Sequence, residues 1–149
     1  MKVEGAQDLP ASRQRVWDML MDPAVLARCL PGCEKLEPIG ENSYRASLKI
    51  GLAAIKGGYT GTVNLSELSH PKSFKMTLEG KGSPGFVRGT AVIKLAEQGD
   101  TTELQYSGEV QVGGLIASIG QRMLQGMTTT MLHHFFEAFE REVRGSSTT

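Results

Sequence analysis

The spacing of the apolar residues changes at Gly113-Gly114, and this change constrains the fold more than any other feature of the sequence. From Cys33 to Val112, apolar and polar residues alternate, which is the period of strands with one buried face. After the glycine pair, apolar residues recur every three or four positions as far as Val143, the period of an amphipathic helix. The chain is therefore predicted to form a sheet followed by a long helix, a fold of the α+β class.

The segment before this sheet predicts one strand and two short helices. A weak alternation over residues 2–9 indicates the strand, and Ser12 is suited to cap the first helix. Asp22 and Pro23 then end that helix and start the second, because proline is accepted in the first turn of a helix but not in its interior. The second helix is expected to end before Pro31.

The alternating region predicts about six strands in a meander, joined by short turns containing Gly, Asp, Asn or Pro. Each strand has one apolar and one polar face, which is typical of an antiparallel sheet with one face in water. The residues predicted to face inward are Tyr44, Leu48, Ile50, Tyr59, Val63, Phe74, Met76, Leu78, Ile93, Leu104 and Tyr106.

The apolar sheet face needs a cover, and the terminal helix is the element long enough to provide it. Its stripe includes Ile116, Ile119, Met123, Met127 and Met131, and about 30 helical residues would reach roughly 45 Å. We therefore expect a helix-grip architecture, in which a curved antiparallel sheet of about seven strands wraps around the helix. The boundaries are predicted as one domain over 1–144 and a disordered tail over 145–149.

The charge balance excludes partners that are selected by bulk charge. Lys plus Arg and Asp plus Glu are both 16, so the formal net charge is zero and the basic excess of a nucleic-acid-binding protein is missing. The sequence contains no run of 18 apolar residues, so it predicts no membrane-spanning helix. Residues 1–5 lack the apolar core of a signal peptide. We expect a cytoplasmic protein, with peripheral, transient contact at the inner face of the membrane as a further option.

The sequence predicts neither a catalytic group, a metal site nor a cofactor. No inward position holds a carboxylate, histidine or cysteine. Cys29 and Cys33 form a C-x-x-x-C pair without further ligands nearby, and we expect two reduced core or loop residues, with a disulfide as the alternative. His133 and His134 are adjacent on a helix and point about 100° apart, so they cannot clamp one metal ion alone.

The methionines of the terminal helix permit two interpretations. They either fill an ordinary core or line a cavity suited to a long apolar ligand, because methionine is flexible and polarizable. Gly120 and Gly126 weaken the same helix and indicate close approach or local bending. In the second interpretation the tyrosines would provide polar contacts for a head group, and the ligand-binding residues would be Tyr44, Leu48, Ile50, Tyr59, Val63, Phe74, Met76, Leu78, Ile93, Tyr106, Ile119, Met123, Met127 and Met131.

Several motifs resemble the carbon monoxide dehydrogenase CoxG family of the START-like superfamily, which also includes the polyketide cyclases (SRPBCC proteins). The more specific motif is Cys29-Leu30-Pro31-Gly32-Cys33-Glu34. The looser ones are Val16-Trp17-Asp18-Met19-Leu20-Met21-Asp22-Pro23 with Leu26, the strand from Tyr44 to Gly51, Gly57-Gly58-Tyr59-Thr60-Gly61, and Gly113-Gly114-Leu115-Ile116 before the long helix. The resemblance extends over residues 2 to 144.

This resemblance implies a START/Bet v 1-like helix-grip fold with a deep apolar cavity between the sheet and the terminal helix. It also implies a non-catalytic carrier of a hydrophobic molecule, such as a quinone or a lipid, that serves a molybdenum-containing carbon monoxide dehydrogenase or a related molybdenum hydroxylase. Two alternatives remain. One is an enzyme of the cyclase or hydrolase type, which would need an inward acid, base or histidine, such as Arg88 or Glu109 turned inward by a bulge would provide. The other is an assembly factor with a packed core that binds proteins.

Overall fold

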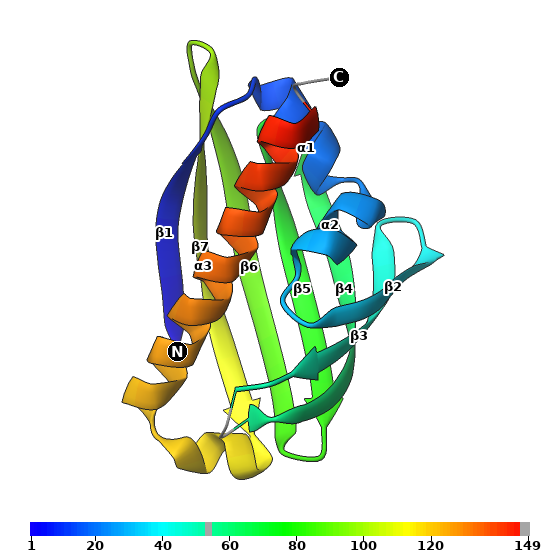
Figure 1. Cartoon of the computed structure of the whole chain (residues 1–149), viewed down its shortest axis with the longest axis vertical. Helices are drawn as coiled ribbons and strands as arrows, with labels where there is room; N and C mark the ends of the chain where they lie inside the picture. Colours follow the sequence, from blue (N-terminus) through cyan, green and yellow to red (C-terminus); the bar gives the residue numbers. More distant parts are fainter. Residues whose placement is uncertain (53–54, 147–149) are drawn as a thin grey trace.

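The structure is a computed structural model that describes residues 1–52 and 55–146. A curved sheet lies behind the long helix α3, and two short helices cover its upper part (Figure 1). In chain order the elements are β1 (Lys2–Leu9), α1 (Arg13–Leu20), α2 (Pro23–Cys29), β2 (Cys33–Gly40), β3 (Ser43–Ile50), β4 (Gly57–Ser69), β5 (Ser73–Gly82), β6 (Gly85–Gln98), β7 (Thr101–Gly113), the 3-10 helix η2 (Gly114–Ile119) and α3 (Gln121–Ser146).

The seven strands form one antiparallel sheet, as the alternation predicts. The order across the sheet is β1-β7-β6-β5-β4-β3-β2, so β2 to β7 form a meander of six strands. β1 lies at the far edge and pairs only with β7, from Lys2 opposite Glu109 to Leu9 opposite Thr102. Glu4 and Gln7 fall on opposite faces of β1, in agreement with its predicted period of two.

The short helices begin where their capping residues predict. The Ser12 side chain accepts a hydrogen bond from the Arg15 N–H at 3.3 Å and caps α1. Asp22 accepts one from the Ala24 N–H at 2.9 Å and caps α2, whose first residue is Pro23. These caps satisfy backbone donors that the first helical turn leaves without a partner.

The terminal helix is shorter than the periodicity predicts. Gly120, with φ 97° and ψ 149°, breaks the expected helix into η2 and the 26-residue α3. Ile116 and Ile119 therefore belong to η2 and not to the long helix. At the other end, α3 continues to Ser146, so Gly145 and Ser146 are helical and not part of the expected disordered tail. The remainder of that tail, 147–149, lies outside the described residues.

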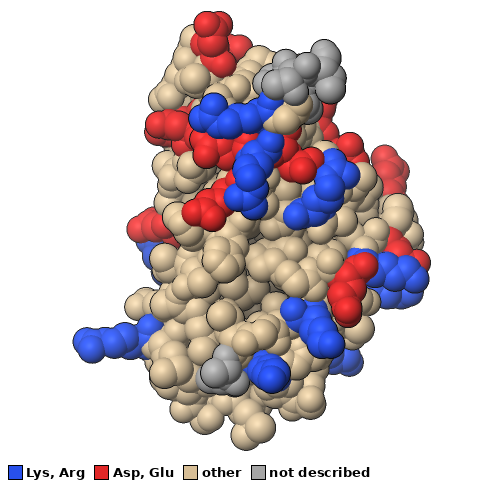
Figure 2. Space-filling model, in the orientation of Figure 1, with Lys and Arg blue, Asp and Glu red and all other residues tan. Residues whose placement is uncertain are grey.

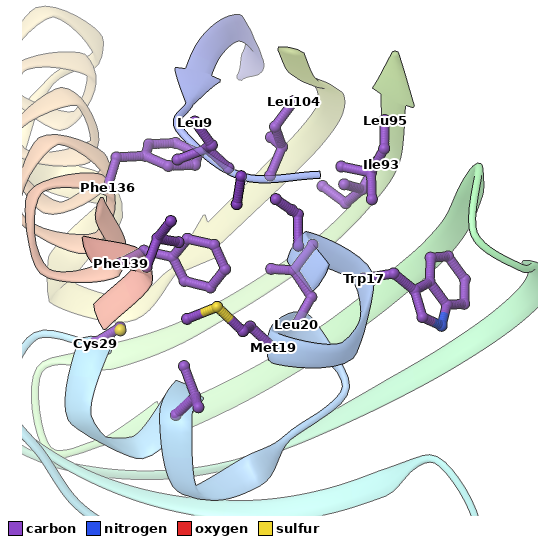
Figure 3. Packing of buried hydrophobic residues seen from close by; sticks show 14 of the residues in the cluster. Leu9, Trp17, Met19, Leu20, Cys29, Ile93, Leu95, Leu104, Phe136 and Phe139 are labelled. Carbon is purple, nitrogen blue, oxygen red and sulfur yellow. The ribbon is translucent and has the colours of Figure 1, made fainter. Parts of the chain in front are cut away.

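The buried apolar residues form two clusters at opposite ends of the sheet. The larger one, called the main cluster, lies where α1, α2 and the C-terminal half of α3 meet the sheet, with Phe139 and Leu9 fully buried (Figure 3). The smaller one, called the η2 cluster, is built around Ile50, Tyr59 and Ile116. The stretch of sheet between the two clusters is where the packing is least complete.

Candidate ligand-binding site

The structure divides the predicted ligand-binding residues between the two clusters and the space between them. Those in or against the main cluster are Tyr44, Val63, Phe74, Met76, Ile93 and Tyr106. Those in or against the η2 cluster are Leu48, Ile50, Tyr59, Ile119 and Met131. Leu78 and Met127 are half-buried and belong to neither cluster, whereas Met123 is 52% exposed and so does not face the sheet as expected.

Between the clusters, side chains on the inner face of the sheet keep contact with solvent. Val63, Leu78 and Val110 lie in one cross-strand row, with Gly89 between the last two, and all three side chains are only half-buried. Met127 lies on α3 between Leu124 and Met131, which both pack against the η2 cluster, and it too is half-buried. A fully packed core buries such residues completely, so α3 does not seal against the middle of the sheet.

Small residues are concentrated on this inner face. They are Ala46, Gly61, Gly80, Gly82, Gly89, Ala91 and Gly108. At Gly80 an added Cβ would find its nearest neighbour, the Thr60 carbonyl oxygen, 3.9 Å away. At Gly89 it would lie 3.3 Å from the Glu109 carbonyl oxygen, a tight contact. Gly80 therefore has room for a side chain, whereas at Gly61, Gly82 and Gly108 a Cβ would collide with the backbone of the neighbouring strand.

A groove lies at the edge of the sheet, between β1 and α3. It has a volume of about 410 Å³, and its apolar floor includes Tyr106, Leu132 and Phe136. The Tyr106 and Phe136 rings are stacked, with centroids 5.6 Å apart. Its other lining residues are Met1, Lys2, Val3, Glu4, Gln7, Gln125, Thr128, Thr129 and His133. A second concavity lies along β1, β6 and β7, and its lining includes Lys94, Gln105 and Tyr106.

The sequence interpretation missed most of this groove. Gln7 lies on the inward side of β1, opposite Leu104, and is a polar residue in an otherwise apolar file. That exception was a usable signal for an opening at the β1 edge. The residues of α3 that face β1 carry no such signal, because the side of the helix that meets the edge strand depends on how the helix lies across the sheet.

The three tyrosines differ in what their hydroxyl groups can do. The Tyr59 hydroxyl donates a hydrogen bond to the Ile55 carbonyl oxygen at 2.6 Å, and burial raises the pKa of Tyr59. The hydroxyl proton of Tyr59 is therefore already engaged within the protein. Tyr44 packs against the main cluster, and Tyr106 lines the groove. Tyr106 is thus the tyrosine placed to contact a polar group at the opening.

The inner face carries no charged side chain along β3, β5 and β7, nor over residues 57–65 of β4 and 87–95 of β6. Arg88 and Glu109, which an enzyme of this fold would need to turn inward, lie on the outer face with 61% and 66% exposure. Arg88 approaches Glu79 at 4.0 Å, and Glu109 approaches the N-terminal amino group at 3.7 Å. The chemistry available inside is therefore apolar contact and hydrogen bonding.

Both cysteines are free, as expected. Cys29 is 2% exposed and packs below the end of α3 in the main cluster (Figure 3). Burial raises the pKa of the Cys29 thiol to about 11, and it also raises the pKa of Cys33. The Cys29-to-Cys33 motif thus connects the end of α2 to the start of β2, and burial favours the neutral form of both thiols.

No group of three or more metal-ligating side chains gathers among the described residues. His133 pairs with Glu137 at 2.8 Å on the exposed side of α3. In the part of the chain that the structure describes, no helix has both the length and the apolar character needed to cross a membrane.

A sequence model of one family matches nearly the whole chain. It is the model of the carbon monoxide dehydrogenase CoxG family, and the match covers residues 5–144. No curated protein matches the chain.

Solved structures share the fold. A crystal structure of a conserved protein from Geobacillus kaustophilus is 38% identical, with a TM-score of 0.95 over 98% of this chain and 97% of that one. A START superfamily protein from Mycobacterium smegmatis is 14% identical, with a TM-score of 0.79 over 97% of each chain. A norcoclaurine synthase point mutant from Thalictrum, solved with a transition-state analogue, is 20% identical, with a TM-score of 0.69 over 99% of this chain and 96% of that one. At the lower identities the likeness concerns the fold alone.

Proposed function

Because this chain belongs to the CoxG family of carbon monoxide dehydrogenase proteins, we propose that it is a non-catalytic binding protein for a hydrophobic molecule, a quinone or a lipid. The molecule would lie between the inner face of the sheet and α3. One observation carries this proposal. The middle of the inner face is apolar and only half-buried, and Gly80 there leaves room for a side chain.

The binding free energy would come from apolar contact. Removing apolar ligand surface from water contributes about 25 cal/mol per Å², so an isoprenoid or acyl chain needs no charged anchor. A polar head group would remain near the groove between β1 and α3, where Tyr106, Gln7 and Gln125 offer hydrogen-bond donors. A deeply buried phosphate or carboxylate finds no cation to pair with at the inner-face positions of β3 to β7 described above.

Binding is a better account of this interior than catalysis. The norcoclaurine synthase neighbour is an enzyme by its printed name, so the fold accepts an active site. An acid, base or nucleophile is needed for such chemistry, and the inner-face positions described above hold only apolar, tyrosine or small polar side chains. The incomplete packing in the middle of the sheet also argues against a protein-binding factor with a filled core.

The test is direct binding with a matched pair of variants. Purified protein is extracted with organic solvent for a co-purified apolar molecule, and binding of decylubiquinone and oleate is measured by equilibrium dialysis. Gly80→Leu should weaken binding at least tenfold, because the new side chain occupies the space inside. Gly58→Leu is the control, since Gly58 is exposed on the outer side of β4 with nothing near its Cβ position. Equal binding by both variants, or no binding by the parent protein, would refute the proposal.

We also propose that the chain serves a molybdenum-containing carbon monoxide dehydrogenase-like enzyme as an accessory protein, in accordance with its family. Co-purification from cells that express such an enzyme tests this point. Its failure would leave the binding proposal intact, because ligand binding is measured on the isolated protein.

A further inference from the structure

The two edges of the sheet differ in how they are protected against pairing with another chain. β2 contains Pro38, and its register with β3 shifts after Cys33 and again after Pro38. Proline and such irregularities are common means of keeping an edge strand from pairing. β1, at the opposite edge, pairs with β7 over eight residues with no proline and no shift of register. Figure 1 shows β1 along one side of the molecule, and β7 is its one partner in the described sheet.

The backbone groups at the free edge of β1 belong to its even-numbered residues. Met1 and Val110 exchange two backbone hydrogen bonds, each of 2.8 Å. In an antiparallel ladder such pairs alternate with pairs that exchange none, so the odd-numbered residues of β1 bond to β7. The N–H and C=O groups that point away from β7 are those of Lys2, Glu4, Ala6 and Asp8. This row of groups is a template for a further strand.

The side chains of β1 suit one antiparallel register with a second copy of the same strand. In this register Gly5 lies opposite Gly5 at a two-fold axis, and Lys2 of each copy lies opposite Asp8 of the other. Residues 2–8 then pair over roughly 20 Å, and the free backbone groups of the two strands face each other. A shift by two residues in either direction instead places Glu4 opposite Glu4 or Asp8, and like charges destabilise a cross-strand pair.

Asp8 has an acidic neighbour whose repulsion this register offsets. Within one copy Asp8 lies opposite Glu103 of β7, so two carboxylates are cross-strand neighbours. Lys2 of the second copy brings a cation to this pair. Asp8 is exposed, and the Lys2 side chain is 64% exposed, with its Nζ atom 3.8 Å from the Glu4 carboxylate of its own strand. Figure 2 shows acidic and basic side chains together along the side of the molecule where β1 lies.

From these observations we infer that the chain forms a two-fold symmetric dimer in which β1 pairs with β1 of a second copy, so that the two sheets become one. The dimer also bears on the groove between β1 and α3, whose lining includes Val3 and Gln7. Val3 lies opposite Gln7 of the second copy in this register, so each copy adds a polar side chain beside the groove of the other. The inference goes beyond the proposed function, which concerns a single copy.

The first test is sedimentation velocity of the purified chain over a range of concentrations, in which we expect a reversible dimer. Lys2→Asp should raise its dissociation constant about tenfold or more, because both contacts between Lys2 and Asp8 become repulsive. Asp8→Lys should act in the same way. The variant that carries both substitutions should dimerise like the parent, since opposite charges meet again. Lys81→Asp is the control, because it changes the net charge equally at an exposed position of β5, away from both edges.

The second test is amide hydrogen exchange measured by NMR on the same samples. The Glu4 and Ala6 N–H groups should exchange rapidly in dilute protein and slowly in the dimer, because the second strand accepts their hydrogen bonds. The Gly5 N–H is the internal reference, since it bonds to β7 in both states.

A chain that stays monomeric at every concentration overturns the inference. A dimer does so as well if the double substitution fails to restore it, or if the Glu4 and Ala6 amides exchange rapidly within it, because it then uses another surface. Decylubiquinone binding is measured separately on the parent protein. Its absence would refute the proposed function and leave the dimer unaffected.

Discussion

Gly61 and Gly80 face each other across β4 and β5 on the inner side of the sheet, and they are glycine for different reasons. A Cβ at Gly61 would collide with the Glu79 carbonyl oxygen, so the close approach of the two strands requires glycine there. A Cβ at Gly80 would meet nothing closer than 3.9 Å. One member of the pair is needed for the curvature of the sheet, and the other leaves space on its inner face.

The two glycines therefore predict opposite effects on stability. Gly61→Ala should lower the free energy of unfolding by about 1–3 kcal/mol, because the backbone must shift to admit the methyl group. Gly80→Ala should raise it by about 0.5–1 kcal/mol, since alanine loses less conformational entropy on folding. Urea denaturation followed by circular dichroism measures both. Equal destabilisation by the two substitutions would show that Gly80 is also sterically required.

Gly120 and Gly126 form a second contrasting pair. Gly120 has a φ of 97°, a conformation that favours glycine, so Gly120→Ala should cost about 1–3 kcal/mol through backbone strain alone. Gly126 lies within α3 with open space around its Cβ position, and Gly126→Ala should stabilise the protein by about 0.8–1.0 kcal/mol. Thermal unfolding compares the two variants. A stabilising Gly120→Ala would mean that η2 and α3 can join into one continuous helix.

Cys29 predicts a loss of stability in alkaline solution. Burial raises its pKa to about 11 in the folded protein, whereas an unfolded chain has a cysteine pKa of about 8.5. The protonated Cys29 thiol contributes fully to the free energy of unfolding below pH 8.5. This contribution is lost as the pH rises toward 11, because the unfolded state releases the thiol proton at a lower pH than the folded state does. This contribution to the free energy of unfolding is on the order of 3 kcal/mol.

The control for this prediction is Cys29→Ala, which should flatten the dependence of unfolding free energy on pH between about 8.5 and 11. Tyr59 also has a raised pKa and keeps part of that dependence in the variant. Measuring urea midpoints across this pH range gives the slope, independent of any constant loss caused by the smaller side chain. An unchanged slope would contradict the assignment to Cys29.

The sequence predicted the sheet and its inner face well, because alternation is a local property that tertiary packing preserves. Phe74 and Ile93 were expected to face inward, and both are buried opposite each other on β5 and β6. The N-caps Ser12 and Asp22 were also predicted correctly. Each side chain binds a backbone N–H two or three residues away, so the contact depends on local sequence alone.

The errors concern geometry that depends on the whole fold. The stripe from Ile116 to Met123 has helical spacing, yet the chain breaks at Gly120, and Met123 points into solvent. Periodicity gives the face of a helix but not where the helix starts or how it crosses the sheet. For the same reason the groove beside β1 could not be located from α3 alone.

The pairing of β1 with β7 also sets the order in which the molecule can be made. A ribosome releases β1 first, but its hydrogen-bonding partner extends to Gly113, so the edge strand waits while the meander forms between them. During that interval the buried side of β1, which includes Leu9, has no sheet to pack on. Synthesis therefore passes through a stage in which the nascent sheet lacks its edge strand β1 and the long helix α3. Apolar surface is exposed to chaperones during this stage.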